Sequence, residues 1–257
     1  MKEKPILFSG EMVRAIRDGR KTQTRRVMKP QPTCYNGIEW LWKPNRKSWK
    51  APAYHWDVDA KPPIALAKFG APYQVGQKLW VRETWRIDGF NGCGDVFVRY
   101  RADDSTSVLV VPEEAEDWEE REWVRWTDAA LAAGATTNDD DCFDFTGIDW
   151  KPPWKPSIFM PKWATRIWLE VTGKRAEQVQ DIDGIDAVLE GTAYPPDTEE
   201  TIDKCPNEWP TYEELLIGPF RALWDSINAK RGFGWDTNCW AWVYEFKRLE
   251  ASEGASR

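Results

Sequence analysis

The order of predicted strands and helices is the feature that most limits the fold of this chain. Apolar and β-branched residues mark extended runs at residues 5–8, 21–28, 75–87, 95–103, 164–182 and 241–250. The helices predicted between these runs are short and do not alternate regularly with them. A doubly wound parallel sheet is therefore not expected. We predict an α+β fold, a small mixed β-barrel with helices packed outside it.

Residues with strong capping preferences set the ends of the predicted helices. Ser9 and Asp183 can accept hydrogen bonds from the first turn of a helix. Gly19 and Gly191 follow helical runs and can take the left-handed conformation that ends a helix. Pro219 is predicted to be the first residue of the last helix, where a proline is tolerated.

Long segments without a regular apolar period are predicted to be insertions into one domain that spans residues 1–257. We expect them at about 30–75, 103–155 and 192–218. The chain has 18 tryptophans. Most of these are expected to fill a β core, because Trp buries a large area, while a minority could stack on a planar ligand such as a nucleobase.

The composition is that of a globular protein outside the membrane. No apolar run approaches the roughly 20 residues that cross a bilayer, and the N-terminal residues do not fit a signal peptide. The 5 cysteines are far apart, without a C-x-x-C pair, which favours reduced thiols. His55 is the single histidine, so most His-based catalytic and metal sites are excluded. We expect a cytoplasmic protein without a metal or cofactor.

A cluster of basic residues stands out in a chain of net charge −7. Residues 1–30 carry nine Lys and Arg against three Asp and Glu, which favours local attraction of an anion over non-specific coating of DNA. In a regular strand Lys21 and Thr24 would point to opposite faces. They can meet only if Lys21 lies in the turn after Gly19.

Glu83 is the carboxylate that the strand pattern places inside the protein. Alternation in the strand predicted at 75–87 puts it on the same apolar face as Trp85. A buried carboxylate needs a partner. A structural salt bridge to Arg26 or Lys21 is the favoured interpretation, and the alternative is that Glu83 is the acid of an active site.

The motifs together resemble the ASCH domain, a branch of the PUA-like β-barrels, and in particular its long phage and prophage members. G-R-K-T-Q-T-R-R at 19–26 is similar to the helix-to-strand motif of that family. V-G-Q-K-L-W-V-R-E at 75–83 resembles its central strand, and 171–191 and 223–246 resemble its later segments. Thr24 stands where the broad pattern has Glu, as it does in ASCH enzymes that hydrolyse N4-acetylcytidine.

The resemblance implies a metal-free amidohydrolase with Lys21, Thr24 and Glu190 as its catalytic residues. A threonine needs a base to remove its proton, and a neutral lysine suits a chain with one histidine. Burial and neighbouring cations would lower the pKa of Lys21 as this role requires. Glu190 at the end of its helix would protonate the departing amine, although a solvated glutamate before a capping glycine fits the residues equally well.

A second group of residues is predicted to contact the substrate, an N-acylated cytosine nucleoside or related modified base. These are Arg20, Thr22, Arg26, Glu83, Trp85, Asn228, Trp235 and Asn238. For Asn238 a role in a turn is favoured, and for Trp235 burial is an equal alternative. The rival function is a non-catalytic module of phage origin that binds RNA, DNA or a modified base, with single-stranded nucleic acid or RNA as partner.

Overall fold

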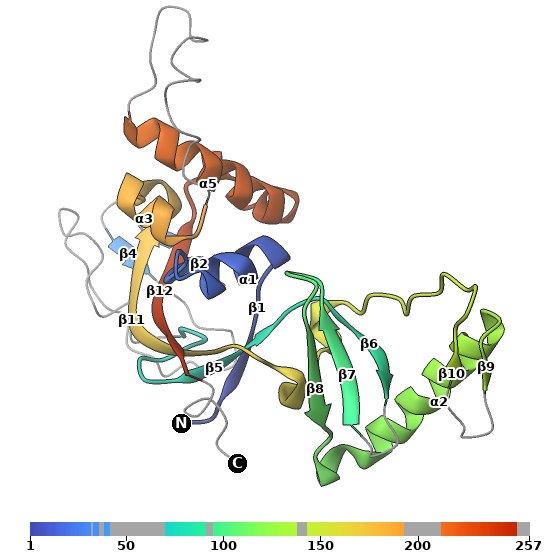
Figure 1. Ribbon diagram of the computed structural model, residues 1–257. Coiled ribbons are helices and arrows are strands. Elements are labelled where there is room, and N and C mark those ends of the chain that lie inside the picture. The colour runs from blue at the N-terminus through green and yellow to red at the C-terminus, as the bar shows by residue number, and fades with distance from the viewer. Residues whose placement is uncertain are drawn as a thin grey trace, which may run out of the picture. The chain divides into compact units, whose positions relative to one another are not determined.

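A computed structural model describes most of the chain (Figure 1). The described residues are 1–31, 33–35, 39–41, 70–90, 95–137, 143–192 and 212–250. His55 and most of the predicted insertions at 30–75 and 192–218 lie outside this part. The contacts divide the chain into two compact units. The first unit is Met1–Lys4, Ala15–Leu79 and Leu169–Arg257, and the second is Pro5–Arg14 and Trp80–Trp168.

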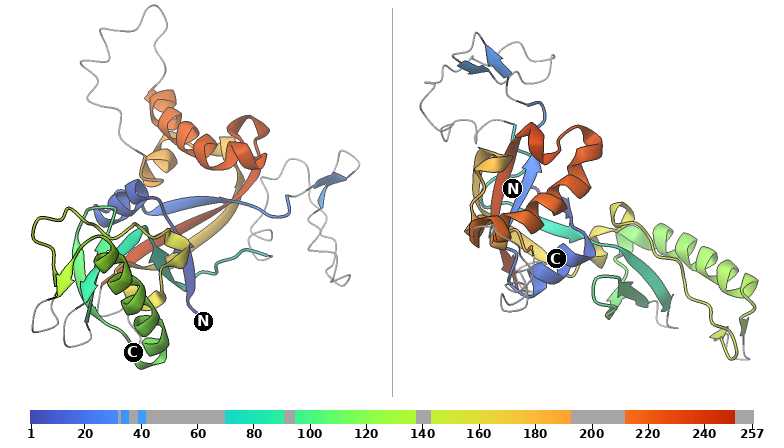
Figure 2. Two further views of the ribbon diagram at one scale, coloured as in Figure 1. Left: turned by 90° about the vertical axis from the view of Figure 1, so that its right-hand side faces the viewer. Right: turned by 90° about the horizontal axis from the view of Figure 1, so that it is seen from above.

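The largest sheet has five strands in the order β1-β5-β11-β12-β2. Its bounds are β1 Lys4–Leu7, β5 Lys78–Arg82, β11 Trp168–Gln178, β12 Trp240–Leu249 and β2 Gln23–Val27. Strands β12 and β2 are antiparallel, and Thr24 stands opposite Tyr244. The long strands β11 and β12 curve side by side in Figures 1 and 2. The predicted first, second, fifth and last extended runs are confirmed as strands.

Helices α1 and α3 end where the sequence predicts. In α1, Gly10–Arg17, the Ser9 hydroxyl accepts a hydrogen bond from the Met12 amide at 3.4 Å, and Gly19 is left-handed with φ 77°. In α3, Gly184–Leu189, the Asp183 carboxylate accepts from the Asp186 amide at 2.7 Å. Gly191 follows Glu190 with φ 79°.

The prediction for Pro219 is wrong, because α5 spans Tyr212–Asn228 and Pro219 lies inside it. A proline there removes one intrahelical hydrogen bond. Packing opposes that loss: Phe220 and Trp224 are buried against Val179 of the short helix before α3. Helices α3 and α5 lie side by side in both figures. These tertiary contacts therefore stabilise a helix that continues through Pro219.

The second unit is a three-stranded antiparallel sheet covered by a helix. Strands β6 Trp85–Phe90, β7 Asp95–Tyr100 and β8 Thr106–Val110 pair in sequence order. Helix α2, Glu116–Ala132, contributes Trp126 to a core with Trp85, Val98 and Tyr100. The run predicted at 95–103 is confirmed as a strand, β7, and it pairs with β6 directly before it. Much of the predicted insertion at 103–155 thus folds within this unit, and the number of domains stays a prediction.

The remaining described elements are short. Strands β3 Thr33–Tyr35 and β4 Glu39–Leu41 form one antiparallel pair, and β9 Thr136–Thr137 and β10 Phe143–Asp144 form another. Single 3-10 turns lie at η2 Glu113–Ala115, η3 Ser157–Phe159, η4 Lys162–Ala164, η5 Val179–Asp181, η6 Ala229–Arg231 and η7 Trp235–Thr237. Mixed helices and sheets confirm the α+β class. Within the described residues no helix has the length and apolar character of a membrane span.

The run at 75–87 is two strands in two sheets, and the prediction of one continuous strand is wrong. Strand β5 ends at Arg82 and β6 begins at Trp85. Between them the Thr84 carbonyl accepts a hydrogen bond from the Arg101 amide at 2.9 Å, as the chain turns to pair with β7. Alternation correctly predicts that Glu83 and Trp85 are buried, since each is 1% exposed. It does not report the partner strand.

Tyr100 provides a test of the core of the second unit. Its hydroxyl donates to the Ala164 carbonyl at 2.8 Å, and burial raises its pKa to about 12. The folded state therefore holds this proton more tightly than the unfolded state, whose tyrosine titrates near 10. Stability from this group, about 2 to 3 kcal/mol, is present below pH 10 and is lost as the pH rises towards 12. We expect urea unfolding between pH 7 and 12 to show this loss.

The matched variant is Tyr100→Phe, which cannot ionise. It should be less stable than the wild type by about 1 kcal/mol at neutral pH, because the hydrogen bond is lost. The difference should shrink or reverse between pH 10 and 12. Parallel stability curves over that range would show that Tyr100 titrates normally in the folded protein.

Candidate functional site

Lys21 occupies the corner between helix α1 and strand β2. Its amide donates to the Ala15 carbonyl at 3.0 Å, directly after the left-handed Gly19, and its backbone forms an isolated bridge with Glu190. The Thr22 amide donates to the Leu189 carbonyl at 3.0 Å. The end of α3 therefore lies against this corner. Lys21 precedes the regular part of β2, as the sequence predicts.

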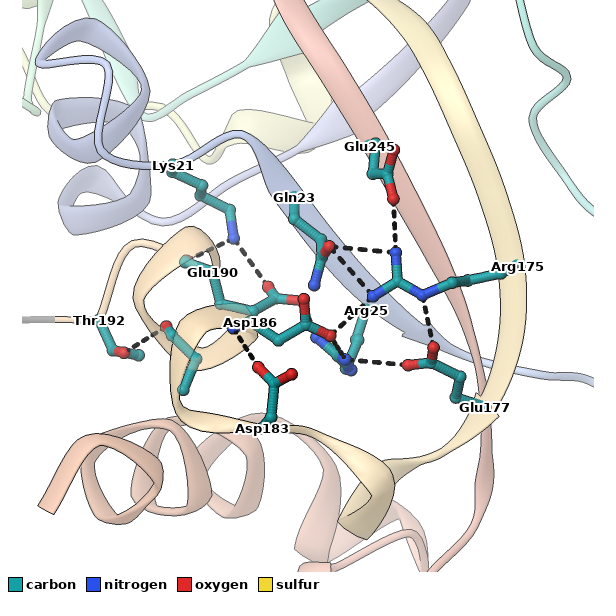
Figure 3. A network of polar contacts seen from close by, with 11 residues as sticks. Lys21, Gln23, Arg25, Arg175, Glu177, Asp183, Asp186, Glu190, Thr192 and Glu245 are labelled. Carbon is teal, nitrogen blue, oxygen red and sulfur yellow. Dashed lines mark hydrogen bonds and ion pairs between the residues drawn. The ribbon is translucent and has the colours of Figure 1, made fainter. Parts of the chain in front are cut away.

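The side chain of Lys21 ends on Glu190, in the interior of the first unit (Figure 3). Its Nζ donates to the Glu190 carbonyl oxygen at 2.6 Å and to the Oε2 carboxylate oxygen at 2.9 Å. The Lys21 side chain is 2% exposed and that of Glu190 4%. Two of the three residues predicted to be catalytic, 169 positions apart, are thus in direct contact.

Burial dominates the electrostatics of this pair. Loss of hydration lowers the pKa of Lys21 below its ordinary value, and the charge and hydrogen bond of Glu190 oppose this. Arg26 and Arg25 lower the pKa of Lys21 further, as nearby like charges do. A lowered pKa increases the fraction of the lysine that is neutral near pH 7, and only the neutral amine can accept a proton.

Arg25 is the second cation on Glu190. Its Nη1 donates to Oε1 at 3.3 Å, and its Nη2 donates to Asp186 at 2.5 Å and to Glu177 at 3.0 Å. Arg175 of β11 also binds Asp186, at 2.6 Å. Figure 3 shows these side chains converging from β2, α3 and β11. The network joins three elements of the first unit through charged groups.

Thr24 belongs to the other face of β2. Lys21, Gln23 and Arg25 face α3 and β11, and Thr24 alternates with them and stands opposite Tyr244. Thr24 is 4% exposed. Among the described residues no hydrogen bond joins its side chain to Lys21. The third predicted catalytic residue is therefore a strand neighbour of the pair without a polar contact to it.

The predicted substrate contacts near the motif differ in exposure. Arg26 lies on the same face of β2 as Thr24, beside Tyr73 and Tyr244. The rings of these two tyrosines pack edge to face, with 5.1 Å between their centroids. Burial lowers the pKa of Arg26 and raises the pKa of both tyrosines. Thr22 is half-buried. Arg20 is at the surface, where it pairs with Asp18 at 3.0 Å.

Glu83 is buried as predicted, but its predicted partner is wrong. Both carboxylate oxygens accept hydrogen bonds from Arg166, each at 2.8 Å, instead of from Arg26 or Lys21. Arg166 follows the 3-10 turn η4, and nothing in the strand pattern of Glu83 identifies it. Trp85, the neighbouring prediction, is a core residue of the second unit, with Lys155 over its ring at 5.2 Å.

The predictions near the C-terminus fall on packing and turn residues. Asn228 is the buried last residue of α5. Trp235 is half-buried, with Phe220 edge to face at 6.2 Å. Asn238 is left-handed, with φ 41°, and its side chain accepts a hydrogen bond from the Gln180 amide at 3.1 Å. The turn interpretation of Asn238 is confirmed.

Sequence reasoning missed the acidic partners of Arg25 and the arginine behind them. The missed residues are Arg175, Glu177 and Asp186. The period-2 spacing of Lys21, Gln23 and Arg25 was the available signal, since it places three polar side chains on one strand face. In the described part of the chain no three His, Cys, Asp or Glu side chains group as metal ligands.

Neither similarity to known proteins nor the cavity of the second unit points to a function for this site. No family model, no curated protein and no solved structure matches this chain. A cavity of ≈ 250 Å³ lies in the second unit, between Trp126, Trp150 and the ion pair of Glu122 with Lys155. None of the predicted site residues lines it. The Lys21–Glu190 pair is therefore the feature of the structure that bears most directly on function.

Gly191 tests how closely α3 packs on Lys21. A Cβ at Gly191 would lie 2.7 Å from the Lys21 Cβ and 2.9 Å from the Ala15 Cβ, at a φ of +79°. Gly191→Ala should therefore lose about 2 to 5 kcal/mol of stability, from backbone strain and steric overlap together. Urea denaturation of the purified variant measures this loss.

Gly19→Ala is the control for Gly191→Ala. Gly19 has nearly the same φ, +77°, but nothing lies within 4 Å of its added Cβ. It should lose only the strain part, about 1 to 2 kcal/mol. Equal losses in the two variants would contradict the close packing of Gly191 against Lys21.

Proposed function

We propose that this chain is a metal-free amidohydrolase that acts on N-acylated cytosine nucleosides or related modified bases, and that its sheets form a PUA-like barrel. The buried Lys21–Glu190 pair supports the proposal most strongly. A lysine at 2% exposure with a lowered pKa is an unfavourable element of a core, and it is the group that a base-catalysed acyl transfer needs. The motif around Thr24 supplies the substrate class.

The proposed reaction has two steps that share one base. Thr24 Oγ1 attacks the acyl carbon, and its proton passes to the neutral Nζ of Lys21. The C–N bond then breaks, and the departing amine takes that proton from the Lys21 ammonium. In the second step, water attacks the acyl ester on Thr24 and gives its proton to Lys21. The ester C–O bond breaks, Thr24 recovers the proton, and the carboxylic acid leaves.

Glu190 acts in this scheme by holding Lys21. The sequence suggests it as the proton donor, but its carboxylate accepts hydrogen bonds from two cations, Lys21 and Arg25. Such a carboxylate is an acceptor, and the ammonium of Lys21 is the nearer proton source for the leaving amine. The scheme also requires Lys21 Nζ to reach Thr24 Oγ1 once substrate is bound, because active-site hydrogen bonds commonly form only in that complex.

Surface cations beside aromatic rings favour one second function, binding of single-stranded nucleic acid. Lys29 Nζ lies 5.6 Å from the centre of the Phe233 ring, and Arg221 lies 6.0 Å from that of Trp235. Stacking and phosphate contacts are the usual basis of such binding. Affinity for RNA that falls steeply with salt would support this function, and salt-insensitive or absent binding would count against it.

Hydrolysis of N4-acetylcytidine, followed as release of cytidine, tests the proposed enzyme. We expect Lys21→Met and Thr24→Val each to lower kcat/KM by about a hundredfold or more, because the base or the nucleophile is removed. In the wild type kcat/KM should rise with pH through the deprotonation of Lys21, which occurs below its ordinary 10.5.

Glu190→Gln and Glu83→Gln form a matched pair for the same assay. Both remove a buried carboxylate that pairs with a cation, so both should lose about 3 to 5 kcal/mol of stability. Only Glu190→Gln should lower kcat/KM at a temperature where both are folded. A loss confined to Glu83→Gln would assign the reaction to the other carboxylate, and full activity of Thr24→Val would remove the nucleophile from the scheme.

A further inference from the structure

Arg25 and Lys21 share the carboxylate of Glu190 as a hydrogen-bond acceptor. Arg25 follows Lys21 by four residues and its side chain also points toward α3, so both side chains reach one glutamate. Lys21 Nζ takes Oε2 at 2.9 Å and Arg25 Nη1 takes Oε1 at 3.3 Å. The Arg25 side chain is 0% exposed. Each oxygen of Glu190 thus has its own cationic donor.

The guanidinium of Arg25 is itself fixed by a set of contacts that does not include Lys21. Its Nη2 donates to Asp186 at 2.5 Å and to Glu177 at 3.0 Å, and Phe220 lies 5.8 Å from the guanidinium carbon. Arg175 binds the same two carboxylates from the outer side. Although burial raises the pKa of Asp186, the hydrogen bond and charge of Arg25 lower it overall, so Asp186 stays ionised.

We propose that Arg25 is a positioning residue, which holds Glu190 so that Lys21 shares its counter-ion and can be neutral. The catalytic meaning of this inference rests on the function proposed above. The contact itself does not. If one anion is divided between two cations, each is stabilised less as a cation than it would be by an undivided partner.

The charges around Lys21 support this division. In the described part of the chain, the charged groups that act on it include Glu190 from the end of α3 and Arg25 and Arg26 from β2. Arg25 is among the groups that lower the pKa of Lys21, after burial and against Glu190. Without Arg25, the carboxylate of Glu190 would interact with Lys21 alone of these two cations, and the effect of Arg26 on Lys21 would be unchanged. The lysine would then stay protonated to higher pH, and less of it would act as a base.

A purely structural role predicts a different outcome. Arg25 could serve only to join β2 to α3 and β11, and its removal would then lower stability without altering the titration of Lys21. Two variants separate these roles. Arg25→Gln removes the charge and keeps hydrogen-bonding capacity, and Arg166→Gln removes an arginine from Glu83, a buried carboxylate of the second unit.

The experiment compares the pH dependence of kcat/KM for the wild type, Arg25→Gln and Arg166→Gln with N4-acetylcytidine. We expect Arg25→Gln to move the acid limb to higher pH, so that kcat/KM at a fixed pH on that limb falls about threefold to tenfold. The high-pH plateau should change by less than about twofold. Arg166→Gln should leave the limb in place. A limb that does not move in Arg25→Gln overturns the inference.

A direct titration of Lys21 keeps the test independent of turnover. In protein with ¹⁵N-labelled lysine, the Lys21 Nζ signal is assigned by its loss in Lys21→Met and followed against pH by NMR. A higher midpoint in Arg25→Gln than in Arg166→Gln supports the inference even if no acylated nucleoside is hydrolysed, an outcome that removes only the proposed function. Equal midpoints overturn it. If Arg25→Gln does not fold, Arg25→Lys replaces it, with a smaller shift expected in the same direction.

Discussion

The ion pair between Lys21 and Glu190 is the interaction on which the first unit depends. It joins the corner between α1 and β2 to the end of α3, two segments that are 169 residues apart in sequence. Two left-handed glycines make this contact possible. Gly19 turns the chain just before Lys21, and Gly191 ends α3 at a position where a side chain would overlap with Lys21. Arg25, Asp186 and Arg175 then continue the polar network across β2, α3 and β11 (Figure 3).

Removing one member of such a buried pair is strongly destabilising, but the intact pair adds little net stability compared with a well-packed apolar pair of similar volume. It alters the chemistry of its members instead. Desolvation lowers the pKa of Lys21, and the carboxylate of Glu190 opposes that shift. Arg25 binds the same carboxylate and so weakens its opposing effect on Lys21. The balance leaves a lysine suited to take a proton, beside a strand that carries the hydroxyl of Thr24. The proposed hydrolysis follows from that balance more than from any single residue.

Local sequence signals predicted the local features well. Capping at Ser9 and Asp183 depends on nearby residues, and so does the position of Lys21 in a turn, so both could be inferred. The α+β class followed from the order of the elements. Long-range partners could not be inferred, because alternation shows that Glu83 is buried but contains no information about Arg166. Pro219 shows the same limit, since packing of Phe220 and Trp224 overrides a local helix signal. The family resemblance implied that Lys21 and Glu190 belong to one site, but neither it nor periodicity predicted that the two side chains are in contact.

Trapping the acyl group on the enzyme would test the proposed nucleophile, Thr24, without relying on variants. The protein is mixed with N4-acetylcytidine, quenched in acid during turnover, digested and mapped by mass spectrometry. The proposed mechanism predicts an acetyl ester on Thr24 that appears with the first cytidine released and disappears as substrate is exhausted. Release of cytidine with Thr24 unmodified throughout would contradict it, because water or another residue would then be the nucleophile, and so would the absence of any release.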